Sequence, residues 1–250
     1  MTATPPDELD TSAQPVSGKP ASLWEDFIDI FVSPSEVFER RRASGFVVPL
    51  LVFAVLTVVI MLIGRSAMEP IFDSEFARGV AAAAKKNPQI TAAQMEGPRA
   101  LTEKLAPVLA GFGALIMPML VGVLLWLAGK LVDAKEDIQA ACMIATYAFF
   151  PRILDSLLRV VQAFLIDPSA LNGQYRVALT PARFLDPDTA SPILLALLGR
   201  IDLFTIWVTV LLAVGLAVVA RIPRSRAAIA AVIVWIVGSL PAVLGALRAS

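Results

Sequence analysis

Histidine is missing from this 250-residue sequence altogether, and cysteine occurs once, at Cys142. Without histidine there is no His-ligated metal site, no Ser-His hydrolysis and no histidine proton relay. A single cysteine excludes a disulfide within the chain. Charge is also scarce, because only 17% of the residues are charged and the formal net charge is zero. A neutral chain has no bulk attraction to nucleic acid, so we expect no nucleic-acid partner.

Hydrophobic residues take the place of the missing charge and make up 57% of the chain. A soluble domain of this length would need more charged residues to cover its surface. Runs of about 20 apolar residues recur, and each is long enough to cross a hydrocarbon layer roughly 30 Å thick. The sequence therefore predicts an all-α, multi-pass transmembrane helical bundle. Its five spans lie at about 46–64, 106–129, 138–159, 201–220 and 227–247.

The region before the first span divides into a tail and a short helix. Residues 1–21 are rich in Pro, Ser, Thr and acidic residues, a composition typical of a disordered tail, and we expect the membrane domain to cover 22–247. The first apolar run begins only near Phe46, so no signal peptide is expected. In LWEDFIDIF (23–31), apolar residues recur at helical spacing opposite acidic ones. This pattern predicts an interfacial amphipathic helix on the membrane surface.

A second short helix is predicted at SPSEVFERRR (33–42). Ser33 fits the N-cap, Pro34 suits the first helical position, and Glu36 completes a capping box. Arginines then stand just before the membrane, where each contributes about 1 kcal/mol to binding anionic headgroups. The residues that we expect to contact headgroups are Trp24, Arg40, Arg41 and Arg42.

Two further patterns lie between and within the spans. The loop 65–104 is expected to be partly helical, because 74–86 has a helical composition and TAAQ (91–94) has the capping-box pattern that starts a helix. Small residues recur at every fourth position of two spans, which favours close packing within the bundle or between copies in a homo-oligomer. These residues are Ala106, Ala110 and Ala114, and Gly238, Ala242 and Ala246.

Positive charges predict the orientation of the bundle. Many arginines and lysines stand close to span ends on the N-terminal side, among them Lys130, Arg221 and Arg224, and fewer stand close to the spans on the other side. Close-in charges of short loops govern insertion. We therefore expect the N-terminus in the cytoplasm and the C-terminus outside.

One segment of the third span, YAFFPRILDSLLRV (147–160), conflicts with its apolar surroundings. At about 100° per residue, Arg152, Asp155 and Arg159 fall on one face of the helix, provided that Pro151 does not disturb its phase. A charged face of this kind contacts protein or water rather than lipid.

Depth adds two residues of the fourth span to this face. A rise of about 1.5 Å per residue places Asp155 roughly 25 Å and Arg159 roughly 31 Å across the membrane from the start of the third span. Counted back from the end of the fourth span, Asp202 and Arg200 reach similar depths. We expect Asp155 to pair with Arg200, or Arg159 with Asp202, which leaves Arg152 without an obvious partner.

Two interpretations of this cluster are open. It is either a polar pocket or proton path, or a set of salt bridges that fixes the register of two helices, and the nearly pairwise balance of charge favours the salt bridges. An aspartyl protease is not expected, because Asp202 lacks the glycine pattern of such enzymes and a catalytic dyad must share a proton. Asp186 and Asp188 lie in a Pro-rich turn and are typical of turn chemistry. We expect no catalysis, no metal and no cofactor.

Four residues carry a resemblance to a known family. Pro34 and Phe38 match a proline-then-aromatic pattern before the first span, and Tyr147 and Pro151 match a pattern of tyrosine, apolar pair and proline in the third. With the five-span layout, they make the chain resemble the Yip1 domain family of integral membrane proteins, in its bacterial form. The resemblance implies the membrane fold, and the Ala-rich spans with short loops indicate the bacterial inner membrane.

The resemblance implies little about activity. Eukaryotic members associate with Rab-type GTPases, but this chain lacks their Asp-Leu-Tyr-Gly-Pro type motif and their long cytosolic N-terminal domain. We expect a non-enzymatic membrane organiser or scaffold that binds the lipid bilayer and protein partners. The alternative is a small transporter or accessory channel subunit with a polar site between spans three and four. Five spans without an internal repeat speak against an independent transporter.

Overall fold

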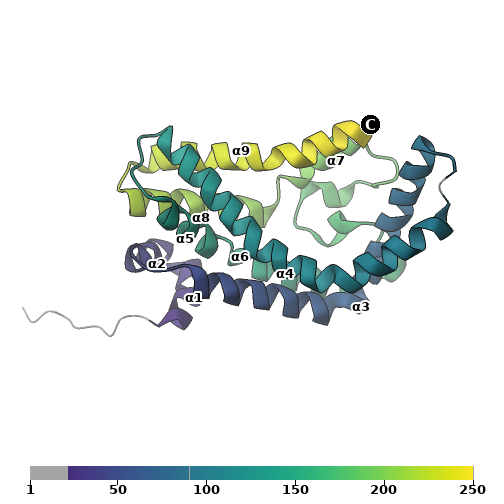
Figure 1. The fold of residues 1–250 in the computed structure, drawn as a ribbon, viewed down its shortest axis with the longest axis horizontal. Helices are drawn as coiled ribbons and strands as arrows, with labels where there is room; N and C mark the ends of the chain where they lie inside the picture. Colours follow the sequence, from purple (N-terminus) through teal and green to yellow (C-terminus); the bar gives the residue numbers. More distant parts are fainter. Residues whose placement is uncertain (1–21, 90, 250) are drawn as a thin grey trace, which may run out of the picture.

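A bundle of helices makes up the computed structural model, which describes residues 22–89 and 91–249 (Figure 1). That part of the chain contains no β-strand, and five of its helical segments are long and apolar enough to cross a membrane. The predicted all-α bundle with five spans is confirmed, while the tail predicted at 1–21 lies outside the described residues. The helices are α1 Leu23–Val32, α2 Pro34–Arg41, α3 Val47–Lys86, α4 Ala92–Lys130, α5 Ile138–Ala148, α6 Pro151–Leu165, α7 Pro192–Gly199, α8 Leu203–Ala220 and α9 Arg224–Ala249.

α3 and α4 are much longer than a membrane is thick. They have 40 and 39 residues, and at a rise of about 1.5 Å per residue each extends roughly 60 Å. The segment 65–104, predicted as a partly helical loop, is therefore almost wholly the continuation of these two helices. The capping box predicted at Thr91 and Gln94 forms at the start of α4. α3 changes direction along its length (Figure 1), and it contains Pro70, which removes one backbone hydrogen bond.

The third span consists of two helices, whereas we predicted one helix over 138–159. α5 ends at Ala148, a turn follows at 149–150, and α6 begins at Pro151 and continues to Leu165. Proline has no N–H to donate and its ring clashes with the carbonyl four residues earlier, so it breaks a helix interior but fits a first position. The break changes the direction of the charged face relative to the residues before it.

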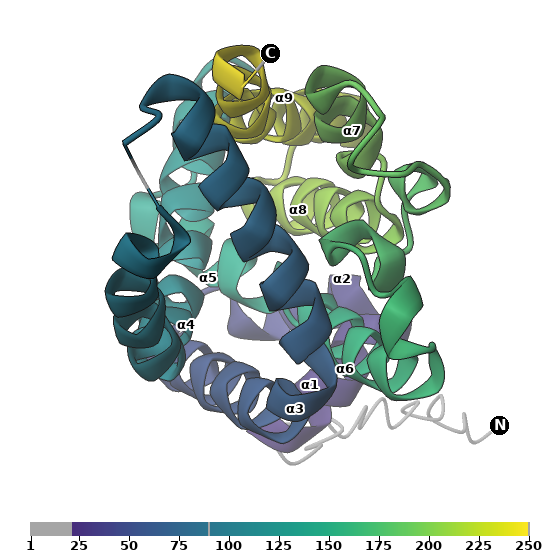
Figure 2. The same cartoon turned by 90° about the vertical axis from the view of Figure 1, so that its right-hand side faces the viewer.

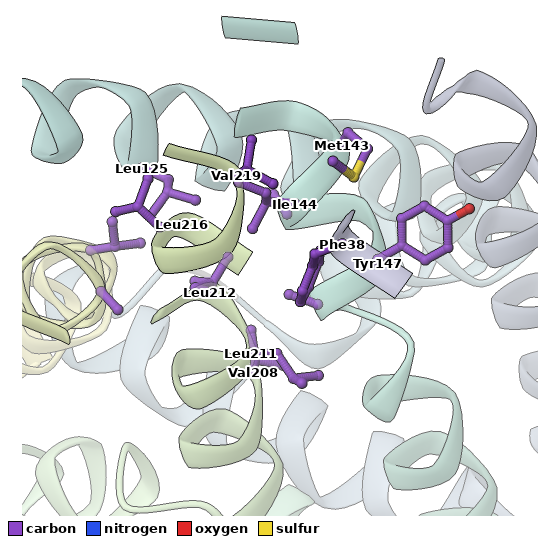
Figure 3. Close-up of a cluster of buried hydrophobic side chains, with 14 of the residues drawn as sticks. Phe38, Leu125, Met143, Ile144, Tyr147, Val208, Leu211, Leu212, Leu216 and Val219 are labelled. Atoms are coloured by element: carbon purple, nitrogen blue, oxygen red, sulfur yellow. The ribbon is translucent and has the colours of Figure 1, made fainter. Parts of the chain in front are cut away.

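α5 occupies the centre of one end of the bundle. All its residues from 141 to 148 are buried, and in Figure 3 Met143, Ile144 and Tyr147 lie among side chains of α2, α4 and α8. Two glycines permit this close packing. A Cβ added at Gly122 of α4 would lie 2.7 Å from the Cys142 Cα, and one at Gly215 of α8 would lie 2.5 Å from the Ile144 Cγ2.

α1 and α2 form a hairpin that packs against this core. Val37 and Phe38 of α2 are fully buried, and Phe38 lies beside Gly215 of α8. α1 buries Ile30 and Asp26 on its inner face. The opposite row of apolar side chains is 69–74% exposed and consists of Trp24, Ile28 and Val32. The helix therefore packs against protein on one side and leaves a row of apolar side chains exposed on the other.

The capping box that we predicted at Ser33 does not form. Ser33 ends α1 and also precedes α2, and its side chain makes no cap hydrogen bond. Its backbone N–H donates instead to the Asp29 carbonyl at 2.7 Å. A capping box of the same type forms eleven residues earlier, at the start of α1, between Ser22 and Glu25.

Short turns and α7 form the opposite end of the bundle, which faces the viewer in Figure 2. The turns are the 3-10 helices η1 Pro168–Ala170, η2 Gln174–Val177 and η3 Pro181–Phe184. Gln162 links α6 to η2, because its side-chain amide donates to the Val177 carbonyl at 2.9 Å. The α3–α4 turn and the C-terminal end of α9 lie at this same end (Figure 1).

Candidate functional site

Asp155 of α6 lies at the centre of the predicted charge cluster. Its side chain is only 8% exposed. Arg152 Nη1 donates to it at 3.0 Å and Arg159 Nε at 2.7 Å. Residues three and four apart share one face of a helix, so α6 by itself assembles an arginine–aspartate–arginine row. The predicted face is present because all three residues follow the break at Pro151.

Asp202 joins the next span to this row. It is the N-cap of α8, where its Oδ1 accepts from the Thr205 N–H at 3.0 Å and secures the first turn. Arg152 Nη1 lies 3.4 Å from the same oxygen, and Arg152 Nη2 donates to Thr205 Oγ1 at 2.6 Å. Arg159 Nη2 is 3.7 Å from Asp202 Oδ2. Both arginines therefore bridge α6 and α8.

The structure changes two of the pairings expected from depth. Arg159 does lie beside Asp202, but Arg152, which we expected to lack a partner, contacts both aspartates. Arg200 forms no ion pair within the described residues, and its Nε donates to Ser239 Oγ of α9 at 2.9 Å. The reason is that Arg200 lies in the turn after α7 and not in α8, which begins at Leu203. The prediction extended α8 as a straight helix back to Arg200 and therefore gave its side chain the wrong direction.

The ion pairs of the cluster join two arginines to two aspartates, so their charges balance. Asp202 Oδ2 is nevertheless buried without a hydrogen-bond partner in the described part of the chain. No hydrogen bond joins the two aspartates in that part, unlike a catalytic dyad that shares a proton. Residues 22–89 and 91–249 also hold no group of three or more His, Cys, Asp or Glu side chains arranged around a metal position. The arrangement links α6, α8 and α9 by polar contacts.

A second charged cluster lies at the other end of the bundle. Asp26 of α1 is fully buried and accepts hydrogen bonds from Arg40 Nη2 at 2.8 Å and from Arg41 Nε. The Tyr147 hydroxyl of α5 donates to it at 3.4 Å. We call these residues the N-terminal clasp, because together they join α1, α2 and α5.

The residues predicted to contact headgroups have different surroundings. Trp24 is 70% exposed on the outer row of α1. Arg40 and Arg41 belong to the clasp, and Arg40 also donates to Asp29 at 2.6 Å. Arg42 forms no ion pair with Asp26 or Asp29, and it lines a cavity at this end of the bundle.

Sequence reasoning missed the clasp because it placed Asp26 on the solvent side of an amphipathic helix. A usable signal was present in the sequence. α1 is rich in acidic residues, the end of α2 is rich in arginine, and a single residue, Ser33, separates the two helices. A hairpin this tight brings the opposite charges together. No comparable signal predicted that Tyr147, more than a hundred residues away, would complete the set.

The residues that carried the family resemblance lie at helix starts and in the packed interior of the bundle. Pro34 begins α2, Phe38 fills the core beside α8, Tyr147 belongs to the clasp, and Pro151 begins α6. The family model of the Yip1 domain matches residues 28–245. No curated protein and no solved structure matches the chain.

Proposed function

The chain belongs to the Yip1 domain family, and from this premise we propose that it is a non-enzymatic organiser or scaffold that binds lipid and protein partners in the bacterial inner membrane. The observation that carries the proposal is its large outward apolar surface. In the most apolar stretch of α3 only 28% of the residues are buried, and in those of α4 and α9 only 22% are. The corresponding share for the span made of α5 and α6 is 61%. Three of the five spans thus turn most of their apolar residues outward.

Small residues on α9 extend this surface toward protein partners. Gly238 and Ala242 are exposed, whereas Ala246 of the same row is buried. On α4 the equivalent row is used inside the bundle, with Ala114 buried. An exposed row of small residues permits close approach of another helix in lipid, from a different protein or from a second copy of the chain.

Cross-linking tests the scaffold role. A photoreactive amino acid at Ala242 should give a discrete cross-linked protein species in membranes, and the same group at the buried Ala246 serves as the control. The same photoreactive group at the exposed Trp24 tests the outer row of α1. If both Ala242 and Trp24 gave adducts with lipid alone, a protein partner at these two surfaces would be contradicted, and lipid binding would remain as the activity.

The charge cluster is proposed to hold helices together, and Asp155→Asn tests this role. Loss of the carboxylate removes the closer of the two acids that Arg152 and Arg159 share, which should cost roughly 3 kcal/mol and lower the unfolding temperature in detergent. Adding Arg159→Gln should restore part of that loss. Asp133→Asn is the control, because Asp133 is exposed and pairs only with Arg226 in the described residues.

A small transporter or accessory channel subunit is the second candidate function. The buried Asp202 Oδ2, which has no hydrogen-bond partner in the described residues and lies 3.7 Å from Arg159 Nη2, favours it. In this case Asp155→Asn would fold with normal stability but alter ion or solute flux in reconstituted vesicles. That combination of results would displace the scaffold proposal.

A further inference from the structure

A cavity of about 220 Å³ lies at the end of the bundle that holds α1 and α2. Its walls come from the residue after α2, the turn before α5, the first turn of α5 and the last turn of α8. The residues of interest in its lining are Arg42, Lys135, Glu136, Asp137, Ala140 and Ala220. Since α5 begins a candidate span and α8 ends one here, the cavity lies at the level where spans meet the membrane surface.

The two basic side chains of this cavity are not used by the protein itself. Arg40 and Arg41 are held by Asp26, but the side chains of Arg42 and Lys135 make no ion pair or hydrogen bond within residues 22–89 and 91–249. Asp137 is occupied, because its Oδ1 caps α5 by accepting from the Ala140 N–H at 2.7 Å.

The Glu136 side chain also lacks a hydrogen-bond partner among the described residues, but unlike the Lys135 side chain it is buried. It is only 5% exposed, and neither of its carboxylate oxygens has a hydrogen-bond partner in the described part of the chain. The ammonium group of Lys130 donates to the Glu136 backbone carbonyl at 3.1 Å and not to its side chain. Burial raises the pKa of Glu136, and Lys130 lowers it less. A buried carboxylate without a donor is costly, so this group is suited to a donor from outside the chain.

Gly129 is what allows the carboxylate to sit there. A Cβ added at Gly129 would lie 2.1 Å from Glu136 Oε1, so the side chain folds flat against the end of α4. No side chain of the described residues donates a hydrogen bond to it in that place. It is therefore able to turn from Gly129 toward the cavity that it lines.

Two unused cations and one unused carboxylate around a cavity are complementary to a ligand with a phosphate and a nearby ammonium. At the membrane surface, that chemistry belongs to aminophospholipids. We propose that this cavity binds the headgroup of phosphatidylethanolamine, with its phosphate between Arg42 and Lys135 and its ammonium on Glu136, beside the apolar wall of Ala140 and Ala220. The inference rests on the proposed function, whose lipid partner it names.

Native mass spectrometry of the full-length protein tests this inference. Protein in mild detergent is incubated with equal amounts of phosphatidylethanolamine and phosphatidylcholine, whose methylated ammonium cannot donate a hydrogen bond. We expect about tenfold preferential retention of phosphatidylethanolamine, the size of one charge-assisted hydrogen bond. Glu136→Gln should abolish the preference, and Arg42→Gln or Lys135→Gln should reduce retention of both lipids.

Matched controls separate the site from general charge effects. Arg224→Gln removes a cation outside the cavity lining at the same end of the bundle, and Asp133→Asn removes an exposed acid from the same turn as Glu136. Both should bind as the wild type does, and circular dichroism should show that every variant is folded.

Three results would overturn the inference. They are equal retention of the two lipids by the wild type, unchanged retention in the cavity variants, and displacement of lipid by soluble phosphoethanolamine or inorganic phosphate at concentrations comparable to lipid. The last would identify a soluble phosphate compound as the ligand. None of these results alters the outcome of cross-linking at Ala242, so failure of this site is distinguishable from failure of the scaffold role.

Discussion

At the scale of single residues, the N-terminal clasp explains why a charged residue is buried in so apolar a protein. Asp26 is fully buried, yet two arginines and a tyrosine hydroxyl surround it. Its carboxylate is shared between helices that are neighbours in sequence and one that is far away. A buried ion pair of this kind contributes mainly through the penalty for removing one of its members.

Asp26→Asn should therefore destabilise the folded protein more than the same change one turn later in α1. We expect a loss of roughly 3 kcal/mol, because Arg40 and Arg41 lose their common acceptor. Asp29→Asn is the matched control, since the Asp29 side chain is 31% exposed and contacts only Arg40 among the ion pairs of the described residues. Thermal unfolding in detergent measures both variants, and losses of equal size would show that burial of Asp26 is unimportant.

Glu136 predicts a pH dependence of stability in delipidated protein. Burial raises its pKa above the ordinary value of 4.5, with Asp137 raising it further and Lys130 and a backbone N–H opposing. A carboxyl group whose pKa is raised by folding stabilises the fold fully below its unfolded pKa. That contribution is lost as the pH rises through the folded pKa, because the unfolded state then releases its proton more easily.

The difference in unfolding temperature between Glu136→Gln and wild type should thus grow as the pH rises above 4.5, in favour of the variant. Using the difference removes the contributions of all other carboxylates. A difference that stays constant between acidic and neutral pH would mean that Glu136 titrates normally. Arg42, Lys135 and Asp137 are the other charged groups that line the same cavity.

At the scale of helices, close packing depends on where the glycines are. At Gly122 of α4, an added Cβ would lie 2.7 Å from the Cys142 Cα of α5, whereas at Gly113 of the same helix it would meet no heavy atom within 4 Å. Backbone atoms cannot rotate out of the way as a side chain can. The close approach of α4 to α5 therefore depends on the absence of a side chain at Gly122.

Gly122→Ala should separate α4 from α5 and cost about 1–3 kcal/mol. Gly113→Ala is the control in the same helix, because an added Cβ there has no heavy atom within 4 Å. The two variants share helix propensity and chemistry, so a difference in unfolding temperature reports packing alone. Equal stability of the two would contradict a close α4–α5 contact at Cys142.

At the scale of the whole molecule, the two ends of the bundle have different constructions. One end holds the α1–α2 hairpin, the clasp, the α5 core and the proposed lipid site. The other holds the α3–α4 turn, the three 3-10 turns and the C-terminal end of α9 (Figures 1 and 2). The predicted orientation places the first end in the cytoplasm, which is where the arginine-rich segments should lie.

Cysteine labelling of intact cells tests that orientation. In a Cys142→Ala background, Ala93→Cys and Arg248→Cys should react with a membrane-impermeant maleimide, whereas Ser35→Cys should react only after the cells are opened. All three positions are exposed in the bundle. Labelling of Ser35→Cys in intact cells would show the opposite orientation, and different results for Ala93→Cys and Arg248→Cys would contradict the four spans expected between those two positions.

Composition alone was enough for the class of fold, because the free energy of placing a helix in lipid depends on the sum of its own side chains. The capping box at Thr91 and the charged face of α6 were predictable for a related reason, since both depend on residues three or four apart. The partners of Arg152 and Arg200 were not. Their directions depend on the break at Pro151 and on the turn before α8, which a straight-helix count ignores.

The sequence by itself therefore determined the class of fold, which is an all-helical bundle with five spans. It also determined the charged face of the third span and the residues that mark the family. Only the tertiary structure decided which charges meet. It buried Asp26 among Arg40, Arg41 and Tyr147, and it left Arg42 and Glu136 beside one cavity without partners of their own. Ion pairs form between groups that are close in space, and in a bundle the distance between residues on different helices is set by how the helices pack.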